Sequence, residues 1–309
     1  MNENYDVVII GAGPAGLTAG IYTSRNRLRT LLLDRETIGG KLPDREKIEN
    51  YPSYPEGISG ADLGTRMFEH ATAYGADLEF DTATSIAIER DRRIVRTLQE
   101  EYAVKAVIIA GGARNKKLHV PGEEEFSGRG VFYCATCDGP GFANQVVAVA
   151  GSGDSGLTEA LYLAGYVKKV IVIEAMDRSG ATKLLQERAF AHPKIEIRLS
   201  TRIEAILGDD RVRSLWLVDA HTARRTQVVV DGLLVWIGME PNTDYLKATV
   251  ELDKAGSVLV NYKMGTRIPG VFAAGDIRHQ SAMQVAAAVG DGATAAIEAC
   301  KYITECNWC

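Results

Sequence analysis

One glycine-rich pattern occurs twice in this chain of 309 residues, and each copy lies between the same kinds of neighbours. Residues 11–16 read GAGPAG after a β-branched run, and residues 151–156 read GSGDSG after another. A helix-like stretch and a second short apolar run follow each loop. The second run ends in an acid, Asp34 or Glu174, and both acids lie 23 positions after the first glycine (34 − 11 and 174 − 151). The repeat predicts two βαβ units built on parallel strands.

This spacing is that of a dinucleotide-binding fingerprint. The first glycine permits a tight turn. The second lets a pyrophosphate approach the backbone at the N-terminal end of the helix, where N–H groups attract anions. The acid accepts hydrogen bonds from ribose hydroxyls. Because strand, loop, helix and acid coincide in both copies, we prefer nucleotide binding to a plain glycine-rich turn, and two copies imply two nucleotides. The expected fold class is α/β, with two Rossmann-like (three-layer ββα) nucleotide-binding domains.

Two breaks in the pattern mark the domain boundaries. The charged segment 114–126 contains Pro121 and Gly122 and is interpreted as a linker, and Pro241 with Asn242 marks a second linker. The 67 residues from 243 onward (309 − 243 + 1) contain no third fingerprint, only an apolar strand at 270–274 and an alanine-rich helical region. They are too few for a separate core. We therefore expect them to complete one nucleotide domain, with the other domain inserted into it.

A pair of cysteines stands shortly before the second glycine loop. Cys134 and Cys137 are separated by two residues, so their thiols can close a disulfide or accept two electrons from a neighbour. The chain has five cysteines, which is too few for a disulfide scaffold of this length. A structural zinc would need a tetrahedral ligand set, and the second close pair, Cys306 and Cys309, lies in a different expected domain. The histidines are scattered, so we predict no metal site. A dithiol beside a nucleotide fingerprint indicates an enzyme that moves electrons from a nucleotide to a disulfide.

The charge and the apolar runs of the chain argue against several other classes. A formal net charge of −5 provides no electrostatic reason to bind nucleic acid or an anionic membrane. The first apolar run, 7–10, is too short for a signal peptide, and no run reaches the roughly 18 apolar residues of a membrane-spanning helix. We expect a cytoplasmic protein without nucleic-acid or membrane partners. In that reducing compartment a C-x-x-C pair is typically catalytic or metal-binding rather than structural.

With these motifs the chain resembles the low-molecular-weight thioredoxin reductases over nearly its whole length. The matching segments are 11–16, 39–42, 48–52, 134–139, 151–156 and 270–276. The run CATCDG ahead of a second glycine loop is highly specific to that family. The resemblance implies a homodimer in which 1–114 plus 243–309 form a discontinuous FAD-binding domain and 115–242 form the NAD(P)-binding and redox-dithiol domain. It also implies that the inserted domain rotates, presenting either the nicotinamide or the dithiol to the flavin.

The resemblance further implies roles for individual residues. Cys137 would face the flavin, Cys134 would exchange with the disulfide of thioredoxin or a thioredoxin-like protein, and Asp138 would be their acid–base group. The residues that would contact FAD are Gly11, Gly13, Pro14, Ala15, Gly16, Asp34, Arg35, Gly40, Lys41, Leu42, Asn50, Gly111, Gly275, Asp276 and Gln284. Those that would contact the nicotinamide nucleotide are Gly151, Gly153, Asp154, Ser155, Gly156 and Glu174.

The second unit departs from the NADPH-dependent members of that family. Those members carry a basic cluster after the second strand, typically His-Arg-Arg and a further Arg, which binds the 2′-phosphate. Here the corresponding positions are Glu174, Ala175, Met176 and Gly180, and Arg178 is the sole cation nearby. At about 4 Å and an effective dielectric of about 20, a carboxylate and a phosphate charge repel each other by roughly 4 kcal/mol. The same carboxylate suits a free ribose 2′-OH, so we expect NADH and disfavour NADPH.

Three other functions stay open. Some relatives that lack the NADPH motifs take electrons from ferredoxin or another donor, and in that case the nicotinamide site would be vestigial. Other relatives are flavin-dependent dithiol oxidases, which pass electrons to O₂. A non-catalytic redox sensor would use its dithiol only to report oxidation to a partner. The intact second fingerprint and its acid favour NADH.

The end of the chain carries the second C-x-x-C pair, Cys306 and Cys309. Such a pair could shuttle electrons from Cys134 to a bulky acceptor. Chain termini are usually poorly ordered, so we interpret this segment as a frayed helix end with spare thiols.

Overall fold

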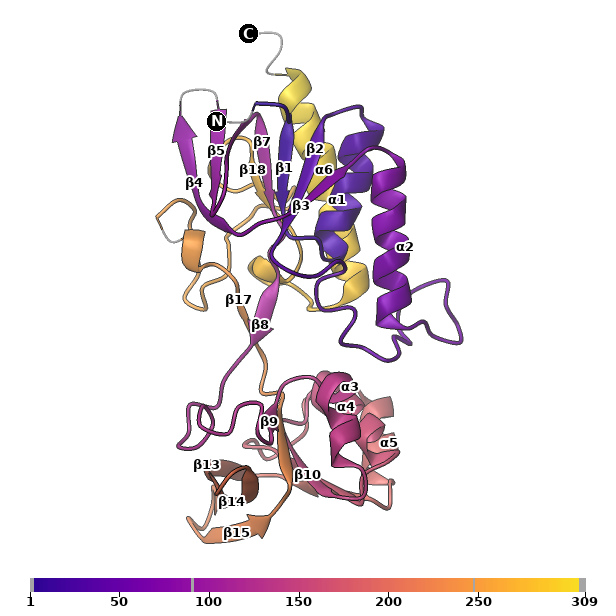
Figure 1. Ribbon diagram of the computed structural model, residues 1–309, viewed down its shortest axis with the longest axis vertical. Helices are drawn as coiled ribbons and strands as arrows, with labels where there is room; N and C mark the ends of the chain where they lie inside the picture. The colour runs from indigo at the N-terminus through magenta and orange to yellow at the C-terminus, as the bar shows by residue number, and fades with distance from the viewer. Residues whose placement is uncertain (1–2, 90–91, 247, 306–309) are drawn as a thin grey trace. The chain divides into compact units, whose positions relative to one another are not determined.

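The computed structural model describes residues 3–89, 92–246 and 248–305. Contacts divide the chain into two compact units, one formed by 1–114 with 240–309 and the other by 115–239. The sequence placed the second boundary at 242/243. In the structure the chain crosses at 239/240, inside strand β17 (Met239–Pro241), which pairs with β8 (Ala113–Asn115) at the other crossing (Figure 1).

The first unit is built on a five-stranded parallel sheet with the order β18-β7-β1-β2-β3. Its central strands are short apolar runs that are buried on both faces, as expected for a parallel sheet. The C-terminal segment completes this sheet, because β18 pairs with β7 through Val271 and Val107. The strands are β1 (Val7–Ile10), β2 (Thr30–Asp34), β3 (Asp77–Phe80), β7 (Ala106–Ile109) and β18 (Val271–Ala273).

Alternate residues of β1 bury opposite faces of this sheet. Val7 and Ile9 pack among three helices, whereas Val8 and Ile10 pack against a small antiparallel sheet. Sheet, sheet and helices therefore form three layers, with the helices together on one face (Figure 1). The helices are α1 (Pro14–Arg25), α2 (Gly60–Ala73) and α6 (Val285–Glu305), and the antiparallel strands are β4 (Ala83–Glu89), β5 (Arg92–Thr97) and β6 (Glu101–Val104).

The second unit repeats this plan on a parallel sheet with the order β12-β11-β10-β16-β9. Val147 and Val149 of β10 pack with Leu157 on the helical face, while Ala148 and Ala150 pack on the face of an antiparallel sheet. The predicted fold class, α/β with two Rossmann-like ββα units, is confirmed. The elements are β9 (Val131–Phe132), α3 (Ala135–Asp138), η1 (Gly139–Phe142), β10 (Val146–Ala150), α4 (Asp154–Ala164), β11 (Lys169–Ile173), α5 (Lys183–Phe190), β12 (Ile195–Arg198), β13 (Thr201–Gly208), β14 (Val212–Asp219), β15 (Arg225–Val229) and β16 (Gly232–Val235).

The segment 114–126 is not the plain linker that its charge suggested. Its first residues belong to the crossing strand β8, but its later part is built into the second unit. Phe126 is 3% exposed and packs in the apolar core, and Glu123 is 2% exposed despite its charge. Composition hid this because a charged residue is buried only where specific donors surround it, and composition does not reveal such donors.

The first unit also contains two single-turn helices, η2 (Asp244–Leu246), which contacts β4, and η3 (Gly275–Ile277), which follows β18 in the chain. Within the described ranges, no helix has the length and apolar character needed to cross a membrane.

Candidate functional site

The first glycine loop connects β1 to α1, and its geometry requires glycine at two positions. Gly11 has φ +112°, and a Cβ there would lie 2.3 Å from the Ala110 carbonyl oxygen. A Cβ at Gly16 would lie 1.8 Å from the Gly11 carbonyl oxygen. Helix α1 begins at Pro14, with Ala15 after it, and its N-cap, Gly13, provides no side-chain hydrogen bond. The first N–H groups of the helix can therefore bind an anion from outside the chain, such as a pyrophosphate.

Asp34 is held at the end of β2 by backbone donors. Its Oδ2 accepts a hydrogen bond from Ala12 N at 2.7 Å, and its Oδ1 accepts from Glu36 N at 3.1 Å and Thr37 N at 3.2 Å. The acid is therefore fixed against the glycine loop, as a ribose-binding acid must be. Arg35, next in the chain, is exposed.

The loop after β2 closes over the first glycine loop. Gly39 N donates to Ala12 O at 2.8 Å, and a Cβ at Gly40, which has φ +60°, would lie 3.1 Å from the Gly13 Cα. Leu42 is buried beneath this loop. Burial lowers the pKa of Lys41 to about 8, although the carboxylates of Asp44 and Asp276 oppose the shift.

Residues from the C-terminal segment join the same region. Gly275 has φ +78°, its N–H donates to Asp291 Oδ2 at 3.1 Å, and a Cβ on it would lie 2.9 Å from the Ala15 Cβ. Burial raises the pKa of Asp276, whose Oδ1 accepts a hydrogen bond from Ser281 Oγ at 3.0 Å. At the start of α6, Gln284 Oε1 accepts from Asn50 Nδ2 at 2.9 Å. The first unit thus gathers predicted FAD contacts from three distant parts of the chain.

Among the described residues, two buried polar atoms near Gly111 lack a hydrogen-bond partner. Asn242 donates from Nδ2 to the Gly111 carbonyl at 2.8 Å, and a Cβ on Gly111 would lie 3.6 Å from the Tyr245 hydroxyl. Within the described part of the chain, Asn242 Oδ1 and the Tyr245 hydroxyl have no hydrogen-bond partner. Buried polar groups normally find a partner, so these two fit a polar ligand such as a dinucleotide. Neither residue was predicted to contact a ligand, because Asn242 was interpreted as part of a linker and Tyr245 was not singled out.

The second glycine loop repeats the first in the inserted unit. Gly151 has φ +100°, and a Cβ there would lie 2.0 Å from the Trp236 carbonyl oxygen. A Cβ at Gly156 would lie 2.3 Å from the Gly151 carbonyl oxygen. Helix α4 starts at Asp154 with Ser155 next, its N-cap Gly153 makes no side-chain cap, and open space surrounds the position of a Gly153 Cβ. The geometry fits a second pyrophosphate.

Glu174 occupies the place that Asp34 has in the first unit. Its Oε2 accepts hydrogen bonds from Ser152 N and Ser152 Oγ, both at 2.8 Å, and its Oε1 accepts from Met176 N at 3.0 Å. The loop that follows is fastened back onto the glycine loop, because Ser179 Oγ donates to Ser152 O at 2.5 Å and Thr182 N donates to Asp154 Oδ1 at 2.6 Å. The sequence did not predict these roles of Ser152 and Ser179, because nothing distinguishes them from other serines except their position near the glycine loop and the acid.

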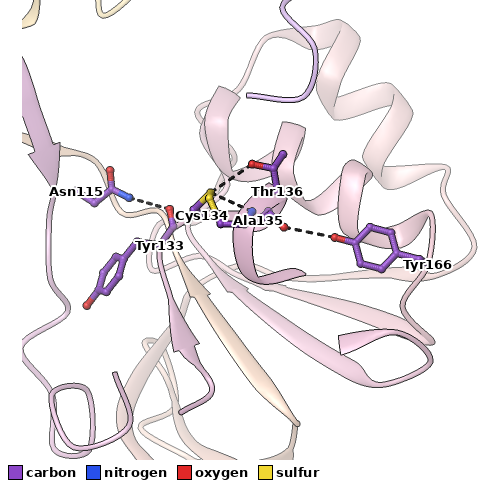
Figure 2. The surroundings of a disulfide bond; sticks show 7 residues. Asn115, Tyr133, Cys134, Ala135, Thr136 and Tyr166 are labelled. Carbon is purple, nitrogen blue, oxygen red and sulfur yellow. Dashed lines mark hydrogen bonds between the residues drawn. A yellow bond between two sulfur atoms is a disulfide. The ribbon is translucent and has the colours of Figure 1, made fainter. Parts of the chain in front are cut away.

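Cys134 and Cys137 form a disulfide at the start of α3, with their Cα atoms 5.4 Å apart (Figure 2). Cys134 is the N-cap of this helix, and its Sγ accepts a hydrogen bond from Cys137 N at 3.2 Å. The Thr136 hydroxyl lies 3.3 Å from the same sulfur. Partial burial raises the pKa of Asp138, the next residue. Donors around Cys134 Sγ favour a thiolate on this sulfur after reduction.

Within the described residues the chain has one further cysteine, which lies in the first unit. Cys300 lies in α6 and is buried, and burial raises the pKa of its thiol to about 11, which makes it unreactive near neutral pH. Cys306 and Cys309 lie outside the described residues, so the interpretation of the tail stays a prediction.

Comparisons with known proteins agree with this arrangement. The family model of pyridine nucleotide-disulphide oxidoreductases matches residues 5–292. Thioredoxin reductase from Bacillus subtilis is 39% identical over 302 residues, which cover 97% of this chain and 95% of that protein.

Two solved structures are also similar. Lactococcus lactis thioredoxin reductase in its FR conformation has a TM-score of 0.96 at 40% identity, over 97% of this chain and 99% of the other. A ferredoxin-flavin thioredoxin reductase from Clostridium acetobutylicum has a TM-score of 0.54 at 30% identity, over 99% of this chain and 100% of the other. The Cys134–Cys137 pair fits the redox-active disulfide of such enzymes. This chain therefore belongs to the pyridine nucleotide-disulphide oxidoreductase family, within which it groups with the thioredoxin reductases.

Proposed function

We propose that the chain is an FAD-dependent reductase of thioredoxin or a thioredoxin-like protein, and that it takes electrons from NADH in preference to NADPH. The observation that carries the donor is the hydrogen-bonded carboxylate of Glu174 beside an intact second glycine loop. Both oxygens of this carboxylate accept hydrogen bonds from the chain, which fixes Glu174 directly after β11, the place of the ribose-binding acid in this type of fold.

The loop after Glu174 supports the same donor. Ala175 and Met176 are exposed and carry no charge, so neither supplies a cation for a 2′-phosphate. A carboxylate about 4 Å from a phosphate charge costs roughly 4 kcal/mol at an effective dielectric of about 20. A ribose hydroxyl instead donates a hydrogen bond to the same carboxylate, and such charge-assisted bonds contribute about 1.5–3 kcal/mol. The balance favours the nucleotide without the phosphate.

The first unit fits FAD through its glycine loop, the fixed Asp34 and the unpartnered polar atoms beside Gly111. Asp276 would contact the ribityl and pyrophosphate region of FAD, and Gln284 would lie near its isoalloxazine ring. The N-terminus of α1 would face the pyrophosphate. FAD, when bound, relays electron pairs between the nicotinamide and the disulfide.

The Cys134–Cys137 dithiol explains why the electron acceptor would be a disulfide. The Cys134 thiolate attacks one sulfur of the substrate disulfide, which forms a mixed disulfide and releases the first substrate thiolate. The Cys137 thiolate then attacks Cys134 Sγ, which restores the internal disulfide and releases the second substrate thiolate. Asp138, with its raised pKa, can supply and remove the protons of these thiols. One electron pair thus passes from the chain to the substrate.

Likeness to the thioredoxin reductases also supports a homodimer and a cytoplasmic location. Light scattering of the purified protein tests the first proposal, and fractionation of source cells tests the second.

A second candidate is an enzyme that receives electrons from ferredoxin or another donor. The missing basic residues at 174–176 and the likeness to the Clostridium acetobutylicum enzyme favour it. In that case the second nucleotide site would be vestigial, although its glycine geometry and Glu174 contacts are complete.

Anaerobic titration of the purified yellow protein with NADH and, separately, with NADPH tests the donor. We expect rapid bleaching of the flavin absorption by NADH at far lower concentration than by NADPH, followed by turnover with a thioredoxin-type disulfide. A preference for NADPH would contradict the charge argument. Bleaching by neither nucleotide would instead support the ferredoxin-type donor.

A further inference from the structure

Glu123 is a carboxylate in the interior of the second unit, with 2% of its surface exposed. Its Oε1 accepts hydrogen bonds from Leu118 N and from the Tyr133 hydroxyl, both at 2.9 Å, and its Oε2 accepts from His119 N at 2.6 Å. A buried carboxylate is costly without such donors, so the cluster is held as a unit. The side chain of Tyr133 is thereby fastened to the segment 118–123.

The backbone of Tyr133 is held by the same stretch of chain. Asn115 Nδ2 donates to the Tyr133 carbonyl oxygen at 3.1 Å, and Figure 2 shows this bond immediately beside the disulfide. Tyr133 follows β9 and directly precedes Cys134. Segment 115–123 therefore anchors both the side chain and the carbonyl of the residue that leads into the dithiol.

Cys134 follows directly after this anchor. The residue is extended, with φ −133° and ψ 110°, which places its Sγ over the start of α3. There the sulfur accepts a hydrogen bond from Cys137 N at 3.2 Å and lies 3.3 Å from Thr136 Oγ1. A rotation of the peptide between Tyr133 and Cys134 would move the sulfur away from both donors. Because these donors favour the charged form, losing them would make the thiolate less stable.

We propose that Glu123 and Tyr133 are positioning residues that hold Cys134 in this capping conformation and so keep its thiolate available for exchange. The inference deepens the proposed function and rests on Cys134 being the exchanging thiol. Burial and the hydrogen bond to Glu123 raise the pKa of the Tyr133 phenol, so it remains a donor throughout the working pH range. The other titratable groups flanking Cys134 in this unit include Cys137, Asp138 and Tyr166, whose hydroxyl lies 3.5 Å from Ala135 O.

The pH dependence of Cys134 alkylation tests this role. We would reduce the full-length protein in a Cys137→Ser background, treat it with iodoacetamide and follow the Cys134 peptide by mass spectrometry. Glu123→Gln and Tyr133→Phe should each move the midpoint of the rate profile upward by about 0.5–1 pH unit, as expected for partial loss of a hydrogen bond to a charged group. Below the midpoint the thiolate population should then fall about three- to tenfold.

The matched control is Glu124→Gln, the same substitution one position on, at a side chain that is 85% exposed. It should leave the midpoint unchanged. Midpoints for Glu123→Gln and Tyr133→Phe equal to that of the control would overturn the proposal. If Glu123→Gln does not fold, Tyr133→Phe decides, because it removes only one oxygen. The assay needs no nucleotide or protein acceptor, so its result is independent of whether NADH or thioredoxin is the true substrate.

Discussion

Removing the negative charge of Glu174 should change which nicotinamide nucleotide the enzyme prefers. The carboxylate is held by Ser152 through Oε2, at 2.8 Å from both N and Oγ, and by Met176 N through Oε1 at 3.0 Å. Glu174→Gln keeps the size of the side chain and one acceptor oxygen. It removes the charge that opposes a 2′-phosphate, and it replaces the second acceptor oxygen with an amide NH₂ group.

The magnitude follows from the charge and its half-buried position. The full repulsion at about 4 Å is roughly 4 kcal/mol at an effective dielectric of about 20, and partial solvent access reduces it to about 3 kcal/mol. That value corresponds to about a hundredfold in affinity for NADPH. The variant also weakens the hydrogen bond to the ribose of NADH, by about 1 kcal/mol. The two effects add to about 4 kcal/mol, so we expect the ratio of kcat/KM for NADH to that for NADPH to fall by roughly 500- to 1,000-fold.

Steady-state reduction of a disulfide acceptor with each nucleotide measures this ratio. The control is Asp177→Asn, which makes the same charge change at an exposed position of the same loop. It should change the ratio little, because screening by solvent weakens an exposed charge. An unchanged ratio in Glu174→Gln, or an equal change in the control, would refute the assignment of Glu174 as the ribose-binding acid.

The other predictions concern the two thiols, the two glycine loops and the carboxyl group of Asp138. Cys137→Ser should trap a thioredoxin-type substrate as a stable mixed disulfide and Cys134→Ser should not; equal trapping on non-reducing gels would contradict their separate roles. Gly16→Ala, whose Cβ would lie 1.8 Å from a carbonyl oxygen of its own loop, should be isolated without FAD. Gly156→Ala, whose Cβ would lie 2.3 Å from the Gly151 carbonyl oxygen, should keep its FAD and stay yellow but resist bleaching by NADH. Visible absorption spectra of the two variants, with and without NADH, check both predictions. A yellow Gly16→Ala protein would argue against FAD in the first unit. Asp138→Asn should slow dithiol turnover about a hundredfold. Because burial raises the pKa of Asp138, its proton is lost as pH rises through that raised value, so the wild-type rate should fall there while the variant's pH profile stays flat. Parallel profiles would exclude this acid.

Local sequence patterns were sufficient for the two nucleotide units. The contacts that define each loop join residues close in the chain, such as Ala12 with Asp34 and Ser152 with Glu174, which are separated by 22 positions. Glycine is required at Gly11 and Gly151 because φ is positive at both, a constraint that acts on the residue itself. Because these requirements involve residues at fixed, short spacings, they can be recognised as a motif in the sequence. The resemblance to a known family added the roles of the dithiol residues, which no local pattern distinguishes.

The sequence by itself therefore determined the two glycine loops, their acids, the parallel strands around them and the presence of a dithiol beside the second loop. Only the tertiary structure decided which distant side chains complete these features. Tyr245 reaches Gly111 from another part of the chain, and Glu123 becomes a buried anchor for Tyr133 within a segment that reads as a charged linker. The physical reason is that burial and pairing of polar groups depend on which surfaces meet after folding, and a lone Glu or Tyr carries no periodic signal of its partner.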